Sequence, residues 1–182
     1  MPTIQPEDFL RRALASIKNT ATNFDDVEIL LRVDDDNQPR IDLLPKLVEE
    51  FGVKSVIGPR GVGYLNMPVF IDDLAKIADS RWCWLFDDDA WVEGDWQSQL
   101  AAIPCDEING PVVNSEFYHL GLSKYSNWPK FGPPGIIAPT ALVKGLEHRC
   151  PVDDQWLSIA IQRNWPLRLM KDVVYYHDGR AR

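Results

Sequence analysis

Segments with strand patterns and segments with helix patterns alternate over about the first 115 residues of the chain. Residues 9–17 place apolar side chains on one face of a helix. Residues 27–33 follow, with apolar side chains at every second position as in a strand. Such alternation predicts strands joined by right-handed helical crossovers, and therefore an α/β sheet. In such sheets, ligands bind at the carboxyl ends of the strands.

The same patterns place the other elements of the sheet. We expect strands at residues 53–57, 82–86, 108–113, 136–137 and 167–176, the last with a bend at residues 171–172. We expect helices at residues 43–51, 66–78, 96–103 and 153–163. Pro45 is expected in the first turn of its helix, where a missing N–H is tolerated. The segment 82–86 is continuously apolar, which predicts a central strand buried on both faces.

Composition and charge exclude several classes of function. The chain has 182 residues, of which 45% are hydrophobic and 25% charged, as in a single soluble domain. Its 27 acidic and 19 basic residues give a net charge of −8, which argues against a nucleic-acid-binding protein and a polybasic membrane anchor. No apolar run approaches the roughly 20 residues of a membrane span, and no signal-peptide pattern opens the sequence. Cys83, Cys105 and Cys150 are too widely spaced for a zinc site or a disulfide framework, which favours a reducing, cytoplasmic compartment.

Three consecutive aspartates, Asp87, Asp88 and Asp89, directly follow the apolar segment 82–86. In an extended segment, alternate side chains point to the same side, so we expect Asp87 and Asp89 to face one side together. Two carboxylates this close repel each other and are stabilised by a nearby cation. Carboxylate oxygens suit a hard ion such as Mg²⁺ or Mn²⁺. The alternative is a solvated acidic turn without a ligand.

Other polar residues stand at the ends of predicted elements. Residues 34–36 are a second aspartate triplet after a strand, although aspartate is also common in turns. His177 ends the last strand, and its imidazole is either a metal ligand or a structural side chain. Asp153 and Asp154 begin a helix, where they act either as a general base or merely stabilise the helix dipole.

Taken together, these segments resemble the GT-A fold of nucleotide-sugar glycosyltransferases of the broad family 2 type. The resemblance covers nearly the whole chain and is more specific in the order of its motifs than in any one of them. The resemblance is carried by residues 1–17, 27–36, 61–78, 84–89, 153–154 and 177. Of these, residues 84–89 resemble the family's DxD motif. The resemblance implies one GT-A domain over residues 1–182, with a Rossmann-like, mixed but mostly parallel sheet and helices on both faces. Residues of about 1–113 would bind the nucleotide sugar, and residues of about 114–182 the acceptor. Because family members usually carry an apolar strand before the Pro-Thr pair at positions 2 and 3, the resemblance also implies a reduced form without this first strand.

The resemblance further implies roles for individual residues. Asp87, Asp89 and His177 would hold Mn²⁺ or Mg²⁺. Asp154, with Asp153 beside it, would deprotonate the acceptor. The sugar of a UDP- or GDP-sugar would then pass, with inversion, to a hydroxyl of a glycan or another acceptor. The donor pocket would include Thr3, Asp34, Asp35, Gly63, Asp87 and Asp88.

Two other interpretations remain open at this point. A chain without its first strand is also compatible with a non-catalytic nucleotide-sugar-binding module on a degraded transferase fold. A phosphatase of the haloacid dehalogenase type also places Asp-x-Asp after an apolar strand. That family, however, has Thr or Val two residues beyond the second aspartate, where this chain has Trp91, and its first motif lies near the N-terminus.

Overall fold

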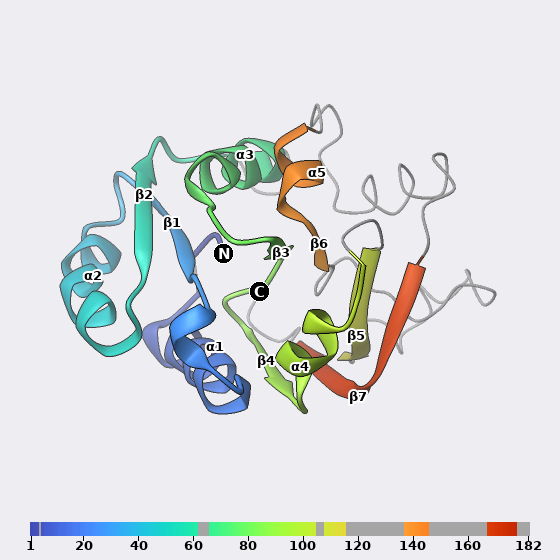
Figure 1. The fold of residues 1–182 in the computed structure, drawn as a ribbon. Coiled ribbons are helices and arrows are strands. Elements are labelled where there is room, and N and C mark those ends of the chain that lie inside the picture. Colours follow the sequence, from blue (N-terminus) through green and yellow to red (C-terminus); the bar gives the residue numbers. More distant parts are fainter. Residues whose placement is uncertain (4, 62–65, 105–107, 116–136, 146–166, 178–182) are drawn as a thin grey trace.

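The computed structural model describes residues 1–3, 5–61, 66–104, 108–115, 137–145 and 167–177 (Figure 1). The helices of this part of the chain are α1 (Glu7–Thr20), α2 (Gln38–Phe51), α3 (Met67–Ile77), α4 (Trp96–Ala101), α5 (Thr140–Gly145) and a short 3₁₀ helix, η1 (Phe24–Asp26). The strands are β1 (Leu30–Asp34), β2 (Lys54–Gly58), β3 (Trp82–Trp84), β4 (Ala90–Glu93), β5 (Ile108–Ser115), β6 (Ile137–Pro139) and β7 (Leu167–His177). The predicted alternation of helices and strands is therefore present from α1 to β3.

The strands form two sheets. β1 and β2 pair in parallel, and the second sheet has the strand order β3-β6-β5-β7-β4. Within it, β5 and β7 are parallel, whereas the β3–β6, β5–β6 and β4–β7 pairs are antiparallel. Figure 1 shows α1 and α4 on one side of the strands and α3 and α5 on the other. Helices thus lie on both faces as expected, but in the described part of the chain a mostly parallel sheet is not confirmed.

The first helix packs against β4 and so supports the strand that follows the aspartate triplet. Its buried side chains, Leu10, Ala13, Leu14 and Ile17, recur at the three- and four-residue spacing of one helix face. Leu10 and Leu14 are fully buried, and each such side chain contributes roughly 1.5–3 kcal/mol. The Ser16 hydroxyl accepts a 3.1 Å hydrogen bond from the Val92 amide of β4. None of the described helices is long and apolar enough to cross a membrane.

Two predictions about local structure are wrong. Helix α2 begins at Gln38, because the Asn37 side chain caps it by accepting a hydrogen bond from the Arg40 amide. Pro45 therefore lies inside the helix rather than in its first turn. Strand β3 ends at Trp84, and its three residues are only half-buried, although a strand buried on both faces was predicted for residues 82–86.

Residues 1–3 lie beside β1 in a parallel arrangement. The Arg32 amide donates to the Met1 carbonyl at 3.0 Å, and the Thr3 amide donates to the Arg32 carbonyl at 3.0 Å. These bonds extend the β1–β2 sheet by a third, very short segment.

The last strand contains the predicted bend. Pro111 of β5 pairs with Met170 of β7, but the next residue, Val112, pairs with Val174. The extra residues of β7 form an irregularity at residues 171–173, which confirms the bend predicted at residues 171–172. Gly94, at the end of β4, lies against this bend with a φ of 96°.

Replacing Gly94 with alanine should therefore destabilise the protein strongly. A Cβ atom there would lie 2.1 Å from the Asp172 carbonyl oxygen, and the left-handed φ is unfavourable for alanine. We expect a loss of about 1–3 kcal/mol, and a Tm lower by roughly 2–4 °C for each kcal/mol, measured by thermal unfolding. Gly145→Ala is the control, because a Cβ atom at Gly145 meets nothing within 4 Å. Equal Tm values for the two variants would contradict the close contact.

Candidate metal and donor site

The aspartate triplet forms a turn between β3 and β4. The Ala90 amide donates a 3.3 Å hydrogen bond to the Asp87 carbonyl, and β4 begins at Ala90. Ala90 pairs with His177 in the antiparallel β4–β7 register. The end of β7 is therefore brought beside the turn. The sequence predicted an extended segment at the triplet. In the structure its side chains are positioned by a turn instead.

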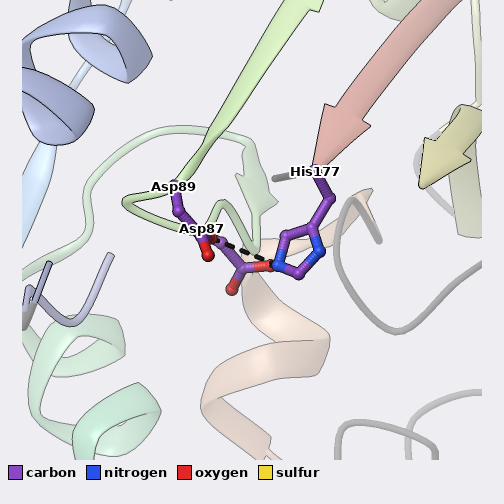
Figure 2. Close-up of side chains that lie close together, drawn as sticks. All are labelled: Asp87, Asp89 and His177. Atoms are coloured by element: carbon purple, nitrogen blue, oxygen red, sulfur yellow. Dashed lines mark ion pairs between the residues drawn. The ribbon is translucent and has the colours of Figure 1, made fainter. Parts of the chain in front are cut away.

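The turn brings Asp87, Asp89 and His177 together (Figure 2). His177 Nε2 lies 3.2 Å from Asp89 Oδ1 and 3.5 Å from Asp87 Oδ2. One ligand atom from each residue lies within 4.8 Å of the others. The side-chain exposures are 9% for Asp89, 14% for His177 and 31% for Asp87, so Asp87 is the most exposed member of the cluster.

This set of donor atoms fits a divalent cation. Two carboxylates held this close in a largely buried site repel each other, and a cation between them removes that repulsion. Their oxygens suit Mg²⁺ or Mn²⁺, and the imidazole nitrogen adds a ligand that transition metals accept readily. Three protein ligands would leave an octahedral ion further positions for oxygen atoms of a bound molecule.

Tyr175 contacts the cluster through Asp87, although the sequence analysis did not identify Tyr175 as a site residue. Its ring is fully buried, and its hydroxyl accepts a 2.9 Å hydrogen bond from the Asp87 amide. The same hydroxyl donates to Asp87 Oδ2 at 3.5 Å. Tyr175 lies two residues before His177, and alternate residues of a strand share a face. That spacing was the available signal in the sequence.

Tyr175→Phe should weaken Mn²⁺ binding about 10-fold while the fold remains intact. The variant loses only the hydroxyl that fixes Asp87, and loss of such outer partners typically costs 10–100-fold in metal affinity. The ring contact with Phe86, at a centroid distance of 4.9 Å, remains. Calorimetric titration with Mn²⁺ measures the effect. Tyr176→Phe is a matched control, because that hydroxyl bonds to Glu93 instead. Unchanged Mn²⁺ affinity in Tyr175→Phe would show that Tyr175 does not position Asp87.

Asp88, the middle residue of the triplet, contacts the loop before α1. It is 5% exposed and accepts a 2.8 Å hydrogen bond from the Gln5 amide. The Gln5 carbonyl in turn accepts a hydrogen bond from the buried Arg40 guanidinium. Burial lowers the pKa of Arg40, although the negative charge of Asp88 acts against that shift. These contacts connect Asp88 to the loop before α1, and its predicted place in the donor pocket stays a prediction.

The other residues assigned to the donor pocket are mostly engaged within the protein. Asp34 pairs with the buried Arg32 and, at 3.6 Å, with Arg60. The Thr3 hydroxyl donates to the Arg32 carbonyl at 3.4 Å, and Thr3 is 1% exposed. Asp35 is exposed in the turn after β1. Gly63, Asp153 and Asp154 lie outside the described residues, so their predicted roles stay predictions.

Three solved structures resemble this chain closely in fold. The mannosyltransferase PcManGT from Pyrobaculum calidifontis, in complex with GDP-Man and Mn²⁺, has a TM-score of 0.70 at 16% identity, over 97% of this chain and 55% of that one. GalNAc-T7 with UDP, GalNAc and Mn²⁺ has a TM-score of 0.71 at 14% identity, over 98% and 42%. S. aureus TarS 1–349 in complex with UDP-GlcNAc has a TM-score of 0.68 at 16% identity, over 98% and 57%.

These similarities confirm the GT-A fold. The chain spans only part of the length of these proteins, 57% of the TarS chain, 55% of PcManGT and 42% of GalNAc-T7. Protein-family models and curated protein sequences gave no match. The fold is thus shown by structural similarity alone, and the nucleotide sugars and Mn²⁺ belong to the neighbouring proteins.

Proposed function

We propose that the chain acts as a divalent-cation-dependent glycosyltransferase that uses a nucleoside-diphosphate sugar, such as a UDP- or GDP-sugar, as donor. The observation that carries this proposal is the Asp87–Asp89–His177 cluster, within a fold shared with two proteins solved with Mn²⁺. The same fold argues against a haloacid-dehalogenase-type phosphatase, which the sequence left open.

The cluster would hold Mn²⁺ or Mg²⁺ through one atom of each side chain. When bound, such an ion offsets the negative charge of the donor diphosphate and of the departing nucleotide. Tyr175 orients Asp87 through its hydroxyl, and the Ala90–His177 pair holds the imidazole beside the two carboxylates. The N-terminal part of the chain, about 1–113, is the proposed donor half. Donor contacts are proposed for Thr3, Asp34, Asp35, Gly63, Asp87 and Asp88.

The acceptor would be activated by a carboxylate in the second half of the chain, about 114–182. In this proposal Asp154 takes the proton of an acceptor hydroxyl, on a glycan or another molecule. The hydroxyl oxygen then bonds to the anomeric carbon, and the bond from that carbon to the diphosphate oxygen breaks. Direct displacement of this kind inverts the anomeric centre. The assignment of Asp154, with Asp153 beside it, rests on the sequence resemblance.

A thermal-shift panel tests the proposed function. The protein is heated with UDP-, GDP- and dTDP-sugars, each with and without Mn²⁺. A donor at about 100 times its Kd adds about 2.7 kcal/mol of stability, which is a rise in Tm of roughly 5–10 °C for a chain of this size. We expect such a rise with at least one donor, and only with Mn²⁺ present. A panel in which no nucleotide sugar raises the Tm would refute the proposal.

A further inference from the structure

The Arg40 guanidinium is buried without a full set of hydrogen-bond partners. Arg40 lies in the first turn of α2 and is 6% exposed. Its Nη2 atom donates to the Gln5 carbonyl, but its Nε and Nη1 atoms have no hydrogen-bond partner among the residues that the structure describes. A buried charge with unpaired donors is costly, and a cation in the first turn of a helix also opposes the helix dipole. The stability of α2 alone therefore does not explain a cation at this position.

The Arg40 guanidinium is linked to the Asp88 carboxylate through the backbone of Gln5. The Gln5 carbonyl accepts a hydrogen bond from Arg40, and the Gln5 amide donates to Asp88 Oδ2 at 2.8 Å. Burial lowers the pKa of Arg40, and the negative charges that act against this shift are those of Asp88 and, more weakly, Glu7. Because Arg40 and Asp88 are both buried, water and salt screen their attraction only weakly. These contacts connect α2 to the aspartate triplet.

Asp88 stands in the sequence between the two carboxylates of the metal cluster. Figure 2 shows these two residues, Asp87 and Asp89, close together in the turn. The Tyr175 hydroxyl accepts a hydrogen bond from the Asp87 amide and so holds the beginning of the turn. The hydrogen bond from Gln5, which is 83 residues away in the sequence, holds its middle. The spacing of the two carboxylates therefore depends on both of these contacts.

We propose that Arg40 is a positioning residue of the metal cluster. Through its charge and through the Gln5 backbone, it holds the Asp88 carboxylate and so fixes the spacing of the metal ligands on either side. In this role Arg40 acts through Asp88 and does not itself bind the ion. The inference rests on the proposed function, because it takes the cluster as a metal site. It also accounts for a costly buried cation at the start of α2.

Titration with Mn²⁺ alone, without nucleotide, measures the effect. Arg40→Met removes the charge and the hydrogen bond to Gln5, and we expect the Mn²⁺ affinity to fall at least about 10-fold, as is typical when a residue that supports a metal ligand is lost. Arg40→Lys keeps a charge and a donor and should recover part of the affinity. Arg11→Met is the matched control and should bind Mn²⁺ as the wild type does, because Arg11 pairs with Glu7 and with Glu50 of α2.

Two further measurements separate positioning from a merely structural role. Low-temperature EPR of bound Mn²⁺ should show an altered zero-field splitting in Arg40→Met, because the carboxylates around the ion are displaced. In an Asp88→Ala background, Arg40→Met should lower the Mn²⁺ affinity by less than about 2-fold further, since the two residues act as one unit. Thermal unfolding without metal checks that each variant folds. Exchanging a buried ion for an apolar side chain of similar volume is often neutral for stability.

Three results would each overturn this inference and leave the proposed function standing. They are wild-type Mn²⁺ affinity in folded Arg40→Met, an equal loss in Arg11→Met, and the full further loss in the Asp88→Ala background. If Arg40→Met does not fold, Arg40→Lys decides in its place, with a loss of at least about 3-fold expected and wild-type affinity as the contrary result. A wild type that binds no Mn²⁺ alone would also overturn the inference, whereas the nucleotide-sugar panel tests the proposed function separately.

Discussion

Asp89→Asn is expected to weaken the Mn²⁺-dependent binding of UDP or GDP by at least about 100-fold. Asp89 lies 3.2 Å from His177 Nε2 and is nearly buried, so its carboxylate cannot be replaced by a neighbouring surface group. An amide lacks the charge that a hard cation prefers. Loss of a residue that only supports a metal ligand typically lowers metal affinity 10–100-fold. Loss of a direct ligand should lower the affinity at least as much.

Calorimetric titration with UDP and GDP, with Mn²⁺ and then with EDTA, measures this effect. Asp25→Asn is the matched control, because Asp25 is an exposed aspartate of η1 far along the chain from the cluster. Unfolding must be followed in parallel, and we expect the Tm of Asp89→Asn without metal to stay at or above that of the wild type, since one of two repelling carboxylates is neutralised. The metal assignment fails if the variant keeps the wild-type Mn²⁺-dependent affinity.

Asp154→Asn is expected to lower the rate of sugar transfer at least about 100-fold with little change in donor affinity. A hydroxyl is a weak nucleophile at neutral pH, and a positioned carboxylate accelerates such a step by roughly 10²–10⁴-fold. Donor binding is proposed to depend on the cluster at the end of β3 instead. A fall in kcat without a change in the donor Kd is the pattern of a group that acts only in the transition state.

Asp153→Asn serves as the neighbouring control. In the helix that the sequence predicts from Asp153, adjacent positions would point about 100° apart, so only one of the two carboxylates would face the acceptor. If Asp153→Asn is the inactive variant, the identity of the base is wrong but the type of reaction stands. Full turnover in both variants would show that the chain uses a different base or does not transfer sugar by inversion.

Local sequence patterns were sufficient to predict features that depend on a single helix or strand. The apolar spacing of α1 predicted both the helix and its buried face, and the polar pair at residues 171–172 predicted the bend in β7. The aspartate triplet after a very apolar segment marked the position of the cluster, and His177 was identified from its place at the end of the last strand. In each case the signal lies within a few residues of the feature.

Contacts between distant parts of the chain could not be read in this way. The turn at residues 87–90 and the strand β4 depend on pairing with β7, which is more than 80 residues away in the sequence. The Asp88 carboxylate is held by the distant Gln5 amide, and the Asp87 amide by the Tyr175 hydroxyl. The half-burial of β3 depends on what lies beside it rather than on its own apolar sequence.

Product analysis with a donor selected by the thermal-shift panel tests the central claim most directly. The protein, the donor, Mn²⁺ and a set of hydroxyl acceptors are incubated, and nucleoside diphosphate, inorganic phosphate and glycosylated product are measured. We predict that nucleoside diphosphate and glycosylated product form in equal amounts, and that both are lost with EDTA and in Asp89→Asn. A donor that binds but stays intact with every acceptor, or one that releases inorganic phosphate instead, would contradict a metal-dependent glycosyltransferase.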